Sequence, residues 1–119
     1  MKENKKIAWK VFKDKRGEIH INKVGGREIN VIFTKAGMYR AGDYHATEQY
    51  SLVIKGRLEI TLRRGKRDVI KRYGKNDFIT ISRNVPHLYK SLTDSVIIQW
   101  LAGSYKTRYY EPYRKIIKS

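Results

Sequence analysis

Five side chains that could hold a metal or move a proton lie in two short stretches of the chain. Asp43, His45 and Gln49 lie in the first stretch, and His87 and Tyr89 in the second. Asp43 and His45 are two positions apart, so in an extended strand both side chains leave the same face. His87 and Tyr89 share a face for the same reason. The spacing therefore predicts a converging polar cluster in the pocket of a small β-barrel.

Proton transfer is the first chemistry that such a cluster would suit. Moving a proton next to the keto group of a sugar needs a base whose pKa lies near the working pH, and an acid on the other side. His45 is the expected base, oriented or charged by Asp43. The acid is expected from one of three tyrosines, Tyr89, Tyr44 or Tyr39.

Metal binding is the second chemistry. Asp43, His45 and His87 offer one carboxylate and two imidazoles, which are the ligand types of a non-haem iron site. Gln49 offers a weaker fourth oxygen. A divalent transition metal (Fe, Mn, Ni or Zn) would therefore suit these residues, whereas the proton-transfer interpretation requires no cofactor.

A purely structural interpretation of the same residues stays open. In it, Asp43 caps a turn after Gly42 and His45 only begins a strand. His20 alternates with apolar neighbours far from the cluster, so we expect a surface position on a strand.

The elements that must position these side chains are strands. Period-two alternation dominates, and no stretch of eleven or more residues sustains a helical repeat. Many short strands at regular spacing predict an all-β fold, a small jelly-roll barrel. Nine strands are expected: Ile7–Phe12, Glu18–Lys23, Glu28–Thr34, Gln49–Lys55, Arg57–Arg63, Lys66–Lys71, Phe78–Ile81, His87–Lys90 and Ser95–Leu101.

Two of these strands carry information about faces. In the strand 49–55 the apolar residues occupy the even positions, so alternation places Gln49 on the opposite, wetter side unless both sides are covered. The strand 95–101 is apolar on both sides. We therefore expect it to be central in its sheet or covered by another chain.

Length and composition bound the class of protein. The 119 residues fit one domain, 1–119, with an aromatic and basic tail at 105–119 that wraps the domain or a partner subunit. A homodimer is the simplest way to cover exposed strands. The chain has no cysteine, no visible signal peptide and no apolar run of about 18 residues, so we expect a cytoplasmic protein without a membrane span.

The net charge is strongly positive. Lys and Arg number 27 against 11 Asp and Glu, a formal +16, which attracts phosphates and other anions. The basic residues are spread along the whole chain and no nucleic-acid-binding signature accompanies them. A nucleic-acid partner is therefore not favoured.

Several motifs carry a resemblance to cupins. The segment Asp14–Ile19 resembles the Asp-x-Arg-Gly-x-apolar opening of nucleotide-sugar cupins, such as dTDP-4-dehydrorhamnose epimerases and dTDP-sugar ketoisomerases. The segment Thr34–His45 resembles their Gly-x-x-Arg-Gly-x-His-x-His strand entry. The segment Tyr109–Lys115 is similar to the tails of small cupins of polysaccharide biosynthesis.

The resemblance implies roles for residues that match the motifs. Arg16 and Arg40 match arginines that contact substrate phosphates. Asp43 stands where the epimerases carry their catalytic histidine, and its ordinary pKa of about 4 is well below the value of about 6.5 for histidine. His45 matches the second family histidine. Gln49 matches a glutamine of the ketoisomerases, in place of the Glu of metal-binding cupins.

Two positions complete the expected site. His87 matches the third cupin histidine, and together with Tyr44 it is expected to contact the substrate. Ala41 stands where the family has Gly after the arginine.

The sequence thus predicts a homodimeric cupin that binds an anionic small molecule, most simply a nucleotide sugar. Isomerisation or epimerisation of a keto sugar by proton transfer is the leading activity. A non-catalytic ligand-binding cupin and a metal-dependent oxygenase-type cupin are the alternatives.

Overall fold

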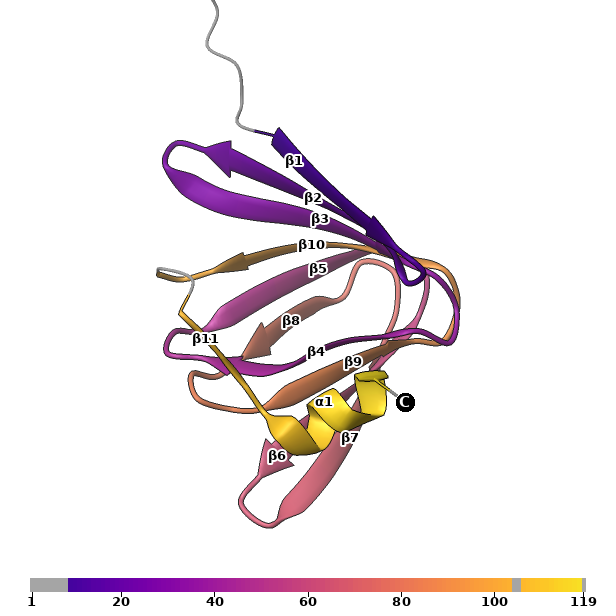
Figure 1. The fold of residues 1–119 in the computed structure, drawn as a ribbon, viewed down its shortest axis with the longest axis vertical. Coiled ribbons are helices and arrows are strands. Elements are labelled where there is room, and N and C mark those ends of the chain that lie inside the picture. The colour runs from indigo at the N-terminus through magenta and orange to yellow at the C-terminus, as the bar shows by residue number, and fades with distance from the viewer. Residues whose placement is uncertain (1–8, 104–105, 119) are drawn as a thin grey trace, which may run out of the picture.

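The computed structural model describes residues 9–103 and 106–118, which form eleven strands and one short helix (Figure 1). The elements are β1 (Trp9–Asp14), β2 (Gly17–Val24), β3 (Arg27–Thr34), β4 (Tyr39–His45), β5 (Gln49–Lys55), β6 (Leu58–Arg64), β7 (Arg67–Tyr73), β8 (Phe78–Ile81), β9 (His87–Ser91), β10 (Ser95–Leu101), β11 (Thr107–Tyr109) and α1 (Glu111–Lys118).

The strands form two antiparallel sheets that face each other across one core. The larger sheet has the order β1-β2-β3-β10-β5-β8, and the smaller has the order β11-β4-β9-β6-β7. Neighbours in each sheet are mostly distant in the sequence, as in a jelly roll. The expected all-β fold is confirmed. In Figure 1 the strands β1 to β3 lie at one end of the larger sheet, and β11 crosses beside β4 to reach α1.

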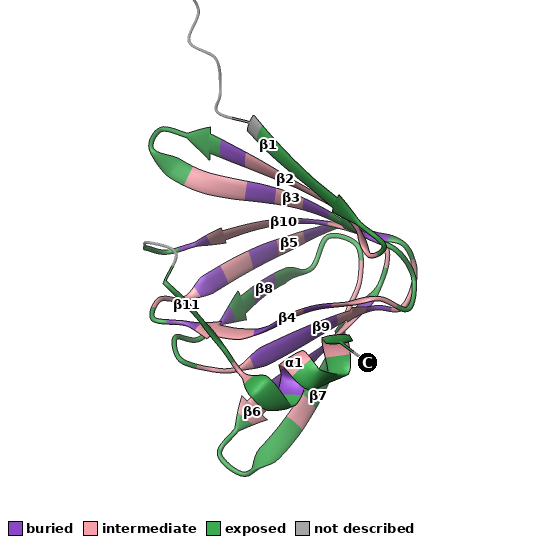
Figure 2. Ribbon diagram, in the orientation of Figure 1, coloured by how far each residue is buried: buried purple, intermediate pink, exposed green. Residues whose placement is uncertain are grey.

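The core lies between the sheets and is built from alternate residues of the central strands. Its largest fully buried side chains include Leu58, Ile60, Ile79 and Val53. Figure 2 shows buried positions along β5 and β9, whereas β1 and the tip of the β6–β7 hairpin are exposed. This alternation gives each central strand one face toward the core and one face away from it.

Gly56 allows the tight connection between β5 and β6. Its φ is 89°, in the left-handed region that favours glycine, and a Cβ at this position would lie 2.3 Å from the carbonyl oxygen of Asp94. The glycine therefore brings the end of β5 against the beginning of β10.

Most expected strands agree with the structure within a few residues, and β5, β8 and β10 agree at both ends. The expected strand 7–12 begins outside the described residues. The alternation in β4 is broken by two residues with positive φ, which is why this strand is absent from the expected set.

The C-terminal tail, expected to wrap the domain or a partner subunit, contains two regular elements. Positions 105 and 119 lie outside the described residues, and between them the chain forms β11, which pairs with β4, and α1. Pro112 occupies the second position of α1, where its missing N–H costs nothing. The helix packs against β4 of its own chain. No helix among the described residues is long and apolar enough to cross a membrane.

Candidate functional site

A bulge in β4 sets the position of the acidic residue. Ala41 and Gly42 have φ values of 78° and 69°, and the pairing with β9 shifts register between Ala41 and Asp43. A bulge of this kind re-aims the side chains that follow it. As a result, Asp43 stands directly opposite His87 on the neighbouring strand.

Asp43, His45 and His87 form a compact cluster. Asp43 Oδ1 lies 3.1 Å from His87 Nε2 and 3.6 Å from His45 Nε2. Each of the three residues offers one possible ligand atom, and these three atoms all lie within 4.8 Å of one another. Both histidines are buried, with exposed fractions of 6% for His45 and 1% for His87. The structure therefore brings together the three residues whose convergence the sequence predicts.

The outer nitrogen of each histidine is held by a neighbouring group. The backbone carbonyl of Val85 can only accept a hydrogen bond, so His87 Nδ1 donates to it at 2.9 Å. His45 Nδ1 lies 3.1 Å from the hydroxyl of Thr107 on β11. Contacts of this kind orient metal-binding histidines and leave the other nitrogen facing the centre.

Burial also affects protonation. Desolvation lowers the pKa of His45 below its ordinary value, and the charge of Asp43 only partly opposes this shift. His45 is therefore neutral near pH 7, the form that can bind a metal or accept a proton.

The donor set fits a divalent transition metal. Asp43 Oδ1 and His87 Nε2 are buried and find no hydrogen-bond partner in the part of the chain that the structure describes. Two acceptors that face each other at 3.1 Å are repulsive unless a cation lies beside them. Carboxylate and imidazole are ligands of Fe, Mn, Ni and Zn.

Gln49 faces the interior, which reverses the expectation for β5. Gln49 and Ser51 are buried, while Tyr50 and Leu52 on the opposite face are only half-buried. Both buried polar side chains have a partner. Gln49 Nε2 donates to the Tyr89 hydroxyl at 2.9 Å, and the Ser51 hydroxyl lies 3.0 Å from the same oxygen. Burial raises the pKa of Tyr89 well above its ordinary value, so its hydroxyl stays protonated.

A cavity of about 310 Å³ lies between the sheets next to this cluster. Asp43 and Tyr89 line it, and so do Arg16, Arg40 and Arg114. Three arginines among the lining residues make the cavity a place for an anion.

Arg40 is the most deeply buried of the three arginines. It donates from Nε to the Thr34 hydroxyl at 2.7 Å and from Nη2 to the Phe33 carbonyl at 3.1 Å. Burial, together with the nearby charge of Arg16, lowers the pKa of Arg40 to about 10. The side chain is still cationic at pH 7, and its charge is only weakly screened by water.

Two tyrosines considered for the site lie elsewhere. Tyr44 does not line the cavity, because alternation in β4 points it away from the face that Asp43 and His45 share. Tyr39 has Lys90 over its ring, with Nζ 5.4 Å from the ring centre. Tyr89 is thus the tyrosine that the fold brings to the cluster.

Sequence analysis missed several residues of the cavity wall. Asn30 and Gln99 face each other across β3 and β10 and line the cavity. A polar residue inside an otherwise apolar strand was the available signal. Arg114 and Tyr109 come from the tail, and no periodicity in the sequence indicates that this segment returns to the site.

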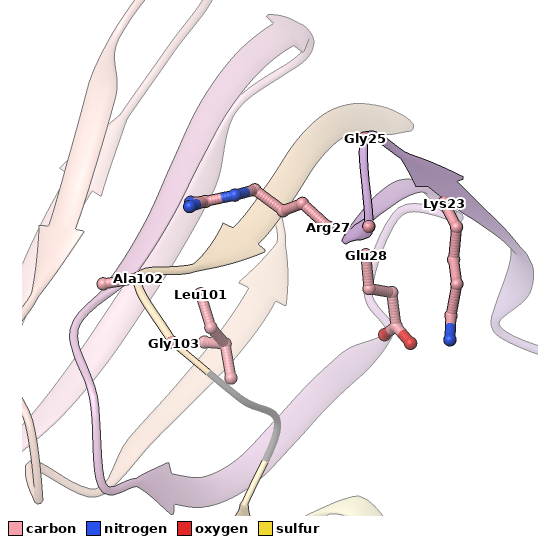
Figure 3. Close-up of a pocket in the computed structure, with 8 residues that line it drawn as sticks. Lys23, Gly25, Arg27, Glu28, Leu101, Ala102 and Gly103 are labelled. Carbon is pink, nitrogen blue, oxygen red and sulfur yellow. The ribbon is translucent and has the colours of Figure 1, made fainter.

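A second, larger hollow of about 410 Å³ lies between the β2–β3 hairpin and the end of β10 (Figure 3). Figure 3 shows Lys23 and Glu28 side by side, with Arg27 extending from the hairpin. Its walls are mostly exposed, and it shares no lining residue with the cavity that Asp43 lines. The smaller cavity, which combines a buried acid with three arginines, is therefore the candidate site.

Comparisons with known proteins bear on the fold. No protein-family model matches the sequence, and no curated protein matches it. Among solved structures, the capsular polysaccharide assembling protein CapF from Staphylococcus aureus matches with a TM-score of 0.70 and 22% identity over 86% of this chain and 34% of that chain.

Oxalate decarboxylase from Bacillus subtilis matches as well. One structure, of a deletion mutant, has a TM-score of 0.73 and 17% identity over 83% of this chain and 29% of that chain. Another, described with Mn(II) centers, has a TM-score of 0.71 and 19% identity over 82% and 28%.

The chain thus has the cupin fold, as its sequence motifs predict. It spans about a third of the length of the structures it matches. At these identities the likeness shows the fold alone.

Proposed function

We propose that this chain is a cupin that holds a divalent transition metal at Asp43, His45 and His87 and binds a small anion in the adjoining cavity. The observation that carries the proposal is the facing pair Asp43 Oδ1 and His87 Nε2, which are 3.1 Å apart, buried and without a hydrogen-bond partner among the described residues. A cation between them converts a repulsive contact into two ligand bonds.

The anion is supported by the charge and size of the cavity. Arg16 and Arg40, which match phosphate-binding arginines of nucleotide-sugar cupins, both line it. Its volume of about 310 Å³ is at the lower end of the range of about 300–1,000 Å³ for small-molecule sites. A compact anion therefore fits better than a large one.

The roles of the residues follow from their places. When bound by Asp43, His45 and His87, the metal would supply a Lewis acid next to the cavity. Arg40 orients the anion, Gln49 fixes the Tyr89 hydroxyl, and the tight packing around the histidines excludes water. The Mn(II) centers of a structural neighbour are consistent with this class of site.

A nucleotide-sugar ligand, with isomerisation or epimerisation by proton transfer, is the second candidate. Its support is that a neutral base and a protonated acid lie near the same cavity: burial lowers the pKa of His45 and raises that of Tyr89. The structural likeness to a capsular polysaccharide assembling protein agrees with a sugar ligand.

The metal is tested by elemental analysis of protein purified without chelator, followed by titration of stripped protein with Mn²⁺ and Co²⁺. We expect about one metal per chain and visible Co²⁺ absorption bands. His45→Gln and His87→Gln should each lose most of the binding, because each removes one of three donors. The matched control is His20→Gln, since His20 is a half-buried histidine paired with Glu18 at 2.9 Å on the outer face. Equal binding in all variants would refute the metal site.

A further inference from the structure

Arg114 reaches the cavity from the C-terminal helix. Its Nη1 donates to the Ala41 carbonyl at 3.0 Å, and its guanidinium carbon lies 4.4 Å from the centre of the Tyr109 ring. Both Arg114 and Tyr109 line the cavity that Arg16, Arg40 and Asp43 also line. The helix thus places a cation on a wall that is otherwise built by strands.

The charges around the cavity do not balance. Arg16 is neutralised by Asp14, to which it donates from Nε at 3.0 Å and from Nη2 at 2.7 Å. Arg40 and Arg114 donate only to neutral acceptors in the hydrogen bonds between described residues, and neither has an ion pair there. Asp43 also lines the cavity, but its carboxylate contacts the two histidines rather than either arginine. Two guanidinium groups without an ion pair among the described residues therefore face the cavity, against one carboxylate.

We propose that Arg114 is a ligand-binding residue and that the cavity takes a compact dianion, with one oxyanion group at Arg40 and the other at Arg114. A dicarboxylate or a small phosphorylated molecule has this chemistry. The inference rests on the proposed function in using the same cavity.

The surroundings of Arg114 suit this role. The guanidinium carbon of Arg114 lies over the Tyr109 ring, and only Nη1 is used in a hydrogen bond to the Ala41 carbonyl. The remaining N–H groups of a guanidinium can bind a carboxylate or phosphate with two parallel hydrogen bonds. Close packing fixes the stem as well, because a Cβ on Gly42 would lie 2.9 Å from Arg114 Cδ. The helix therefore presents a rigid cation rather than a loose surface side chain.

Isothermal titration with malonate, inorganic phosphate and acetate tests the proposal. Wild type should bind the first two in preference to acetate. Arg114→Ala should weaken malonate and phosphate binding by roughly 10- to 100-fold, as expected for a lost charge-assisted pair of hydrogen bonds, and should affect acetate less. Arg114→Gln keeps a donor for the Ala41 carbonyl, so it should show the same loss even if Arg114→Ala unfolds.

The matched control is Arg108→Ala, which removes the same charge from the same tail. Arg108 alternates with Thr107 and Tyr109, so it faces away from the cavity. Its affinity should change less than twofold. Equal losses at Arg108 and Arg114, or no binding of either dianion by wild type at 10 mM, would overturn the proposal. Metal content, measured on the same samples, should be unchanged in Arg114→Ala. This measurement distinguishes a failure of the proposed metal site from a failure of the Arg114 proposal.

Discussion

Asp43 Oδ1 and His87 Nε2 face each other at 3.1 Å in a buried site, and neither atom has a hydrogen-bond partner among the described residues. His87 Nδ1 donates its hydrogen to the Val85 carbonyl. The contact therefore places two lone pairs together, which costs stability until a metal ion enters. Such a cost is typical of a functional site.

Asp43→Asn should stabilise the metal-free protein while it abolishes metal binding. The amide can donate to His87 Nε2 and replace a repulsive contact with a hydrogen bond, a gain of about 1 kcal/mol. Thermal unfolding with and without chelator checks this, and the stabilisation that Mn²⁺ gives wild type should be absent from the variant. Asp14→Asn should instead lower stability, because Asp14 pairs with Arg16. A less stable Asp43→Asn protein would contradict this account of the site.

Ala41→Gly should raise stability by about 1 kcal/mol. Ala41 has a φ of 78°, which costs an L-residue about 1–2 kcal/mol and costs glycine almost nothing. The measurement is urea unfolding of the metal-free protein. Ala46→Gly is the control, since Ala46 is not among the described residues with positive φ, and there the extra freedom of glycine should reduce stability. Equal effects of the two changes would argue against strain at the bulge.

Local patterns in the sequence are enough to predict the fold class and the convergence of the acid and the two histidines. Turn glycines and period-two alternation locate most strands, and side-chain parity brings Asp43 and His45 to one face. The register shift that sets Asp43 opposite His87 depends on a bulge, which alternation cannot reveal.

The faces of β5 and the tail could not be predicted in this way. Alternation says that Gln49 lies opposite Tyr50, but not which of the two faces the core. The apolar side was expected to be the buried one, whereas the buried side of β5 carries Gln49 and Ser51, which contact the Tyr89 hydroxyl. The eight residues of α1 are too few to show a helical repeat, and Arg114 reaches the site only through tertiary packing.

Tyr113→Phe should loosen the helix that holds Arg114. The Tyr113 hydroxyl donates to Asp68 Oδ1 at 2.5 Å and ties α1 to the β6–β7 hairpin. Because Asp68 is exposed, we expect a loss of less than about 1 kcal/mol in global stability. Hydrogen exchange of residues 111–118 should rise, and malonate affinity should fall with metal content unchanged. Tyr110→Phe is the control, because its hydroxyl has no hydrogen bond among those found between described residues. Unchanged exchange in Tyr113→Phe would show that the contact does not hold the helix.

Because of the same contact, α1 should be less stable at both acid and alkaline pH than near neutral pH. Hydrogen bonds from Tyr113 and, to a lesser extent, from Arg63 lower the pKa of Asp68 below its ordinary value of 3.8. The stabilisation of α1 by the Tyr113–Asp68 hydrogen bond is therefore present above pH 3.8 and is lost as the pH falls through the folded-state pKa. Burial and the bond to Asp68 raise the pKa of Tyr113 above its ordinary value of 10.0, so the stabilisation is complete below pH 10 and declines above it. Hydrogen exchange of α1, corrected for the intrinsic rate, should be slowest between these limits and faster outside them. Asp68→Asn should abolish the faster exchange of α1 at acid pH, while the strands of the two sheets stay protected. If α1 of this variant still exchanges faster at acid pH, the effect belongs to another carboxylate.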